Sequence, residues 1–407
     1  MSTDYEKALG RKIALNRKRR GLSQKELAGR LDRSEAWVSQ VERGVRRIDR
    51  MTVLEKVADV LDIPIAELAA EAPIIAATTE PDAPGAARLR LLLSAAHSLN
   101  AILGRHEPPD VAALRADVDR AWELTHAGRY TDLADLLEQL VPRLENAARS
   151  APEHQHPELF RLLAATYHTC SAALATMGEP EAAWIAADRA VVAAEQANDP
   201  LLMAAGAFRL SIVFLGARHY DQAAQASGTA AEALRPLTDT GQPQATALRG
   251  ALTLQRAIAA AHTNQADDAY RYLHEAREMA QQIGEGRNDY NTEFGPTNVG
   301  LHEVSVAVEL GDAGIALRAA DTIDPSALST ERQTRFHLDV ARAHTQRRQT
   351  NEALHALLKA HQLSPEMVHT MPMAKQLVAD LLTMATTAGQ EPPQRLRALA
   401  TEVGLAV

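Results

Sequence analysis

The stretch Ser23–Gly44, SQKELAGRLDRSEAWVSQVERG, predicts two short helices joined by a tight turn. Ser23 is a favourable N-cap, and Glu26 completes a capping box in which each side chain bonds the other's free backbone N–H. Ser34 opens the second helix, and Gly44 ends it in the left-handed conformation. The apolar residues of both helices fall on facing sides and share one small core: Leu27, Ala28, Leu31, Val38 and Val41. The pattern is typical of a helix-turn-helix.

The outward face of the second helix carries short or polar side chains, which suit entry into the major groove of DNA and contact with base edges. These are Glu35, Ala36, Ser39, Gln40 and Arg43. Trp37 has two interpretations. It either packs in the core or a dimer contact, or contacts the DNA backbone beside the groove.

The residues S-Q-x-E-L-A and then S-x-x-x-V-S-x-x-E-x-G resemble the phage-repressor (Cro-like, XRE) helix-turn-helix family over residues 8–68. The resemblance implies an all-α, five-helix, lambda-repressor-like domain that binds double-stranded DNA. It also implies that Gln24, Glu35, Ala36 and Gln40 contact phosphates or bases. Glu35 can accept from cytosine N4, and Ala36 can pack on a thymine methyl group.

The charge is divided unevenly along the chain. Residues 1–50 hold 14 Lys or Arg against 7 Asp or Glu, so the remaining residues must carry −16 to give the total of −9. The basic run Arg17–Arg20, with Arg46, Arg47 and Arg50, is expected to neutralise phosphates beside the groove. The complete set of predicted DNA-contacting residues is Arg19, Gln24, Lys25, Ser34, Glu35, Ala36, Trp37, Ser39, Gln40, Arg43 and Arg46.

Composition bounds the class of protein. The chain has 407 residues, 46% of them hydrophobic, which is typical of a globular protein of two or three domains. Cys170 is the single cysteine, so an intramolecular disulfide is impossible and a cytoplasmic location is expected. The sequence shows no signal peptide and no apolar run of membrane-spanning length, so no membrane partner is expected. Arg outnumbers Lys by 36 to 7, as in proteins from GC-rich bacterial genomes.

The domain organisation follows from breaks in helical periodicity. Helices are predicted over 5–19, 51–61 and 64–68 around the helix-turn-helix, which gives a DNA-binding domain over 1–70. The stretch EAPIIAATTEPDAPGAA, which contains three prolines, predicts a linker over 71–88. Residues 89–407 are almost wholly helical in pattern.

This second region repeats. Six units each contain a turn and a helix that opens with small or acidic residues, as in GRYTDLADLL and GEPEAAWIAA. The equivalent positions are Leu133, Ala182, Ala223, Ala269, Ala316 and Ala353, with a final helix pair over 373–403. The units resemble tetratricopeptide repeats and predict an α-solenoid with an extended concave surface. A helical bundle without superhelical order is the alternative.

The long connection 284–299, GEGRNDYNTEFGPTNV, is the best candidate for a ligand site, because long loops in compact arrays tend to be functional. Tyr290, Asn298 and His302 are expected to line it, with Arg209 and Arg249 as further polar groups. In the alternative interpretation Thr297 is only an N-cap, Phe294 only a plug between repeats, and both arginines are exposed or paired.

No catalytic motif is present, and the sequence predicts neither an enzyme nor a cofactor. His154 and His156 lie in the Pro-flanked segment PEHQHP, where a solvated loop is favoured over a metal site.

The whole arrangement is similar to the RRNPP group of bacterial regulators, in which the repeat domain binds a signalling peptide and dimerises. The resemblance implies a homodimeric transcription regulator that responds to a ligand. Two alternatives remain open for the repeats: a groove that holds a small metabolite, or a protein-interaction scaffold without a small ligand.

Overall fold

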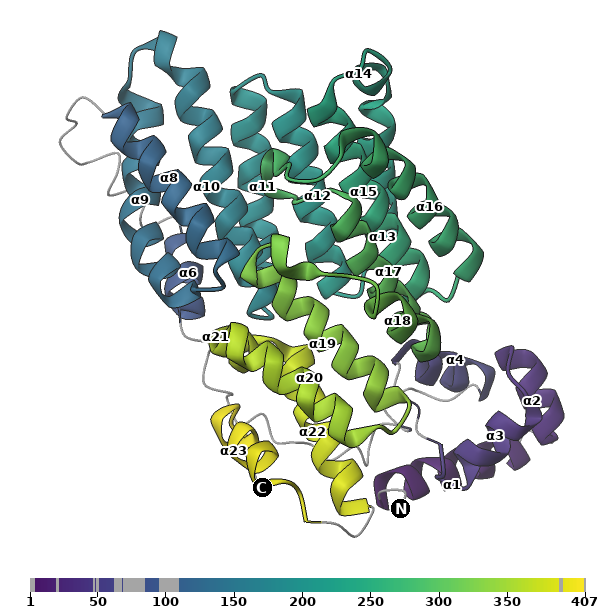
Figure 1. Ribbon diagram of the computed structural model, residues 1–407. Coiled ribbons are helices and arrows are strands. Elements are labelled where there is room, and N and C mark those ends of the chain that lie inside the picture. The colour runs from purple at the N-terminus through teal and green to yellow at the C-terminus, as the bar shows by residue number, and fades with distance from the viewer. Residues whose placement is uncertain are drawn as a thin grey trace. The chain divides into compact units, whose positions relative to one another are not determined.

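The computed structural model describes residues 4–19, 22–46, 48, 51–61, 68, 85–94, 110–387 and 391–405. It divides into two compact units, Met1–Pro81 and Asp82–Val407. Every regular element among the described residues is a helix (Figure 1), which confirms the all-α prediction.

The first unit is the predicted helix-turn-helix domain. Its described helices are α1 (Asp4–Arg19), α2 (Gln24–Leu31), α3 (Glu35–Glu42) and α4 (Met51–Leu61). The Ser23–Glu26 capping box is complete, and the Ser34 hydroxyl accepts from the backbone N–H of Trp37. The predicted fifth helix, 64–68, falls outside the described residues except for Leu68, which is buried in the common core.

Helix α1 crosses the end of α3 at very short range. A Cβ on Gly10 would lie 2.4 Å from the carbonyl oxygen of Val41, so no side chain fits there. Gly44 has a φ of 68°, and its N–H bonds the Val41 carbonyl while the next N–H, of Val45, reaches Gln40. This pair of bonds is a Schellman motif, so Gly44 ends α3 in the predicted conformation.

The second unit begins with α6 (Ala86–Leu92), so residues 86–88 of the expected linker are helical. The helix pairs of the array then follow one another (Figure 1): α8 (Val111–His126) with α9 (Tyr130–Ser150), α10 (His156–Thr176) with α11 (Pro180–Gln196), α12 (Pro200–Gly216) with α13 (Tyr220–Ala233), and α15 (Pro243–His262) with α16 (Ala266–Ile283). The later elements are α17 (Pro296–Leu310), α18 (Ala313–Ala320), α19 (Thr330–Gln346), α20 (Thr350–Leu363), α21 (Pro365–Thr370), α22 (Pro372–Thr387) and α23 (Gln394–Glu402). Short insertions are α14 (Arg235–Asp239) and the 3₁₀ turns η1 (Glu153–Gln155), η2 (Asp289–Asn291) and η3 (Pro325–Ala327).

The six predicted units all share one backbone signature. In each, the second helix begins two residues after a residue with positive φ: Gly128, Gly178, Arg218, Asn264, Gly311 and Arg348. The buried residue five positions after it is Leu133, Ala183, Ala223, Ala269, Ala316 and Ala353. The repeat prediction is thus confirmed, with one correction. The equivalent position in the second unit is Ala183 rather than Ala182, because the turn before it is placed one residue later.

The array closes on itself, which no feature of the sequence predicts. Helix α19 packs against α8, and the carboxylate of Glu366 on α21 accepts from the backbone N–H groups of Tyr130 and Thr131. One hydrophobic core contains residues of α6 and α8–α12 together with residues of α19–α23. The last helices of the array thus share a core with the first ones, which the expected α-solenoid does not by itself imply.

We expect the Gly10→Ala substitution to destabilise the first unit by about 1–3 kcal/mol, because the added methyl group meets backbone rather than a movable side chain. Hydrogen exchange of peptides from residues 4–61 in the full chain measures the effect. Gly29 is the matched control: it also lies in a helix, but a Cβ added there would meet nothing within 4 Å. Gly29→Ala should stabilise the first unit by about 0.5–1 kcal/mol, because Ala favours the helix over Gly, and should therefore slow exchange slightly. Equal behaviour of the two variants would contradict the close crossing.

His168 on α10 is a buried histidine that the fold keeps neutral. Its side chain is 2% exposed, and burial, assisted by the charge of Arg209, lowers its pKa to about 3. In the unfolded chain the same group has a pKa near 6.5 and therefore takes up a proton first as the pH falls. The contribution of neutral His168 to the free energy of unfolding is therefore fully present above pH 6.5 and is lost as the pH falls toward 3.

Acidification from pH 7 to pH 5 should lower the unfolding free energy of the second unit by about 2 kcal/mol through His168 alone. His168→Asn should be less stable than wild type at pH 7 but should lose about that much less on acidification. Urea unfolding followed by circular dichroism at both pH values tests this. The exposed His274, changed to Asn, is the control. A wild-type pH dependence in His168→Asn would refute the assignment.

Candidate functional site

The predicted DNA-contacting face of α3 is accessible. Glu35, Ala36 and Arg43 are exposed, and Ser39 and Gln40 are half-buried. Lys25 and Arg46 are also exposed, and Ser34 serves as the N-cap. Arg20, Arg47, Arg50 and the side chain of Arg19 lie outside the described residues. Arg43 donates from Nε to the Ser39 carbonyl at 3.2 Å, which places its guanidinium along the helix end.

Trp37 follows the first of its two interpretations in part. Its ring is half-buried against the core of the unit, and the guanidinium carbon of Arg33 lies 5.9 Å from the ring centroid. One side of the Trp37 ring is therefore packed against the core.

Arg17 corrects the predicted role of the basic run. Its side chain is buried, donates from Nε and Nη2 to both carboxylate oxygens of Glu42 at 2.5 and 3.0 Å, and caps the Leu22 carbonyl. Gln24 donates to the same carboxylate at 2.7 Å. Glu42 thus joins α1, α2 and α3, and Arg17 is a structural ion-pair partner instead of a phosphate contact. The sequence places these groups in separate motifs, so it offered no signal for their meeting.

The second candidate site is a polar interior, which we define by Arg209, Asn298, His302 and the connection 288–294. Arg209 is 6% exposed, so it is not the exposed arginine of the alternative interpretation. It donates from Nη2 to the Asn291 carbonyl at 2.8 Å, and its guanidinium carbon lies 5.0 Å from the ring centroid of Trp122. Burial lowers its pKa to about 10.

The connection itself has an unusual backbone. Tyr290, Asn291 and Glu293 all have φ between 51° and 56°, a region that residues other than glycine rarely adopt. Asn298 secures the loop by donating from Nδ2 to the carbonyls of Thr292 and Glu293 at 3.2 and 2.9 Å. Such strain persists only where surrounding contacts impose it, and it concentrates at functional sites.

Of the other predicted ligand residues, His302 and Tyr290 belong to this polar interior, whereas Arg249 shows no bond to it among the described residues. His302 contacts the Asn298 carbonyl through Nδ1 at 2.9 Å, and burial lowers its pKa to about 4. Tyr290 is half-buried, and burial, with Asp199 and Asp289, raises its pKa to about 12. Arg249 is half-buried on α15 and makes no side-chain contact that joins it to this interior.

Phe294 and Thr297 differ in how well they match the alternative interpretation. Phe294 is indeed a plug, since it is 1% exposed and fills the space that a Cβ on Gly250 would occupy. Thr297 is not the N-cap of α17, which is Gly295. The backbone N–H and hydroxyl of Thr297 both donate to the Glu285 carboxylate.

Glu293 is a central residue that the sequence does not single out. Its carboxylate accepts from the backbone N–H and hydroxyl of Ser329 at 2.8 and 2.7 Å. Arg332 and His126 approach it at 3.8 and 3.9 Å. The loop, α8 and the start of α19 therefore meet at one carboxylate. No local motif indicates this, because the partners come from three distant segments.

Several buried polar atoms in and around this interior lack a hydrogen-bond partner among the described residues. They are Trp122 Nε1, His126 Nε2, His168 Nε2, Arg209 Nε, Asn298 Oδ1 and Arg332 Nε. Three of these atoms can only donate. Buried polar groups are otherwise almost always paired, so the cluster indicates a site suited to a molecule that carries acceptor oxygens.

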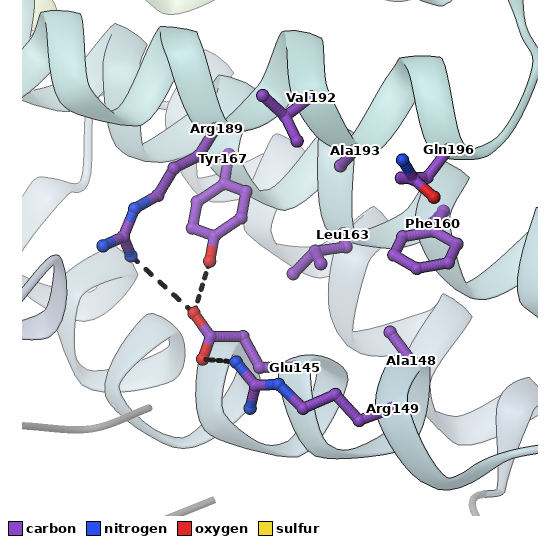
Figure 2. Close-up of a pocket in the computed structure, with 10 residues that line it drawn as sticks. All are labelled: Glu145, Ala148, Arg149, Phe160, Leu163, Tyr167, Arg189, Val192, Ala193 and Gln196. Carbon is purple, nitrogen blue, oxygen red and sulfur yellow. Dashed lines mark hydrogen bonds and ion pairs between the residues drawn. The ribbon is translucent and has the colours of Figure 1, made fainter. Parts of the chain in front are cut away.

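A separate pocket of about 280 Å³ lies between α9, α10 and α11 (Figure 2). Its floor is apolar, with Phe160 and Leu163 among the lining residues. At one end Glu145 accepts from the Tyr167 hydroxyl and pairs with Arg149 and Arg189 at 3.2 and 3.7 Å. Burial, then the Glu145 charge, raises the pKa of Tyr167 above its usual range. No sequence motif indicates this pocket, since its residues lie in regular amphipathic helices.

The single cysteine and the histidine pair are not reactive centres of this structure. Cys170 is fully buried on α10, and burial raises the pKa of its thiol to about 12, which makes it unreactive. His154 is exposed, and His156 contacts the Ala151 carbonyl through Nε2 at 2.7 Å. Within the described residues, no helix is both long and apolar enough to cross a lipid bilayer.

Comparison with known proteins supports the first unit most directly. Residues 8–70 match the family described as a helix-turn-helix domain. The matched residues are those that the sequence pattern identifies as a helix-turn-helix. No curated protein matches the chain.

Three solved structures are similar to the chain. They are a Rap protein with competence and sporulation factor (TM-score 0.44, 10% identity, covering 72% of this chain and 99% of that one), PlcR of Bacillus thuringiensis with a peptide and DNA (0.27, 16%, 68% and 96%), and a mutant of PrgX (0.24, 11%, 96% and 98%). At such scores no residue of theirs is carried over to this chain. The chain therefore carries a helix-turn-helix domain over residues 8–70, followed by an array of helix pairs.

Proposed function

We propose that the protein is a cytoplasmic transcription regulator that binds double-stranded DNA as a homodimer and responds to a ligand held in the polar interior of its repeat unit. The single observation that carries the ligand part is the cluster of buried, unpaired polar atoms around Arg209 and the strained connection 288–294. The DNA part rests on the matched helix-turn-helix and the accessible face of α3.

Dimerisation follows from the size of the reading unit. A single helix-turn-helix reads few base pairs, and specific binding needs two half-sites spaced by about one helical turn or a multiple of it. We therefore expect chromatin precipitation of the tagged protein to recover inverted repeats with regular spacing. Recovery of no enriched site would count against a regulator that acts on DNA by itself.

The ligand is expected to carry several acceptor oxygens, as a peptide or a small carboxylate does. The charged groups that meet around the interior are Arg209, Arg332 and Arg335 against Glu293 and Glu331, a net charge of +1. Burial would raise the pKa of Glu331, but Arg335 and Arg332 outweigh it and lower that pKa to about 2, so this carboxylate stays ionised. The excess cation favours an anionic group on the ligand.

A protein-interaction scaffold is the second candidate function, and one surface favours it. Trp184, Ile185 and Val192 on α11 are each about half exposed, and Val192 also lines the pocket of Figure 2. Exposed apolar residues that share one helix are typical of protein contacts. A scaffold would lose its partner when this surface is changed and would be insensitive to Arg209.

The two parts of the DNA site make different predictions. Gln40→Ala should reduce specific binding by about tenfold or more and leave non-specific binding nearly unchanged, because we expect the amide to meet base edges. Arg46→Ala should weaken both kinds of binding and reduce the salt dependence by about one unit of slope. Titration of operator and unrelated DNA at two salt concentrations tests this. Lys56→Ala on α4 is the control, and equal effects of all three variants would contradict the assignment.

The ligand site is tested with Arg209→Gln, which removes the buried cation. Operator binding is measured with and without the peptide and metabolite fraction of the source cells. We expect wild type to respond and Arg209→Gln to lose the response while keeping its dimer mass and basal DNA affinity. Arg256→Gln is the matched control, because Arg256 also packs on an aromatic ring, 4.0 Å from the Tyr272 centroid, in the same unit. A response of both variants equal to that of wild type would favour the scaffold.

A further inference from the structure

Three side chains near the C-terminal end of the array converge on one point. They are His361 on α20, His369 on α21 and Glu402 at the end of α23, helices that lie near one another in Figure 1. The two imidazole Nε2 atoms are 3.3 Å apart. Glu402 Oε2 lies 3.1 Å from Nε2 of His361 and 3.3 Å from Nε2 of His369. The three atoms therefore form a nearly equilateral triangle.

Hydrogen bonds can join at most two of the three edges of this triangle. A carboxylate oxygen only accepts, and each Nε2 either carries a hydrogen or presents a lone pair. If both imidazoles donate to Glu402, its oxygen accepts both hydrogens, and no hydrogen bond joins the two nitrogens that lie 3.3 Å apart. If one imidazole donates to the other, the lone pair of the second faces the carboxylate oxygen. One edge of the triangle is thus always without a hydrogen bond, whichever tautomers are chosen.

A cation inside the triangle would be bound by all three atoms at once, each through a lone pair. Nitrogen and oxygen ligands bind Zn²⁺ at about 2.0–2.2 Å, and two ligands of a tetrahedral site at that range lie about 3.4 Å apart. The observed separations are within about 0.3 Å of this value, and a point about 2 Å from all three atoms lies just outside their plane. The spacing suits a small transition-metal ion, whereas Ca²⁺ prefers more ligands, all of them oxygen.

The surroundings leave room for a further ligand. The side chains of His361, His369 and Glu402 are 24%, 34% and 47% exposed, so water can complete the coordination. An ordinary surface histidine looks different. His274 pairs with Glu278 at 3.6 Å on one helix and has no third ligand beside it. Among the described residues, the triangle is the group in which three such ligand atoms gather within 4.8 Å.

We propose that His361, His369 and Glu402 bind a divalent transition-metal ion, Zn²⁺ in the first instance, with water as the remaining ligand. The sequence predicts no metal site, because the three residues lie eight and 33 positions apart and form no recognised ligand motif. The ion would join α23 to α20 and α21, which gives the site a stapling role at this end of the array. This proposal is independent of DNA binding and of the polar interior.

The test uses the untagged, metal-free full chain and Zn²⁺ alone as the probe, in competition with a chromogenic chelator. We expect one Zn²⁺ per chain, and at least tenfold weaker binding in each of His361→Gln, His369→Gln and Glu402→Gln. His274→Gln is the matched control and should bind as wild type does. Co²⁺ in place of Zn²⁺ should give the absorption of a four-coordinate ion, which a loosely bound surface ion does not.

A second readout separates binding from folding. Circular dichroism of the metal-free variants should match wild type, since the side chains lie at the surface. Zn²⁺ should slow hydrogen exchange of the peptide covering residues 391–405 in wild type and in His274→Gln, but in none of the other three. Equal Zn²⁺ affinity of wild type and the three variants, or loss of binding in His274→Gln as well, would overturn the proposal.

Discussion

The carboxylate of Glu293 is the interaction on which the interior of the repeat unit depends. It holds the start of α19 through the backbone and hydroxyl of Ser329 and lies close to Arg332 and His126. Hydrogen bonds to a charged group contribute roughly 1.5–3 kcal/mol each, so two of them offset part of the cost of the left-handed backbone at Tyr290, Asn291 and Glu293. The carbonyls that anchor Arg209 and Asn298 belong to the same strained segment. Removing this one carboxylate would therefore release several contacts together.

Much of the fold was predictable because it is determined locally. The capping box at Ser23, the left-handed Gly44 and the recurring turn before each second helix depend on residues close together in the chain. The same locality explains the error at Ala182, since a one-residue shift of the turn does not change the small-residue pattern on which the alignment relied. Closure of the array was not predictable, because the Glu366 contact with Tyr130 joins positions 236 residues apart.

In the candidate sites, too, the residues themselves could be picked out from local sequence, but their long-range partners could not. Asn298 and His302 were predicted from their place beside the long connection, and Arg209 as a polar group among apolar ones; all three make contacts in or beside 288–294. Arg249 had the same appearance in sequence, but the described residues show no hydrogen bond or ion pair between its side chain and this interior. Arg17 shows the converse error. The basic run Arg17–Arg20 was predicted to contact phosphates as a whole. The side chain of Arg17 instead lies inside the unit and binds Glu42, and Gln24 binds the same carboxylate.

Closure of the array also has a consequence for how the protein is made. The turn at Gly128 meets Ser364 and Met367, and the turn at Gly178 meets Pro372, so the first helix pairs complete their packing only against the last. A ribosome adds the 236 residues between Tyr130 and Glu366 in a time on the order of ten seconds or more. An open helical array can mature repeat by repeat as it emerges. Here the first pairs leave the exit tunnel with their partner surface still unsynthesised, so the nascent chain must wait with apolar surface uncovered until its final quarter arrives.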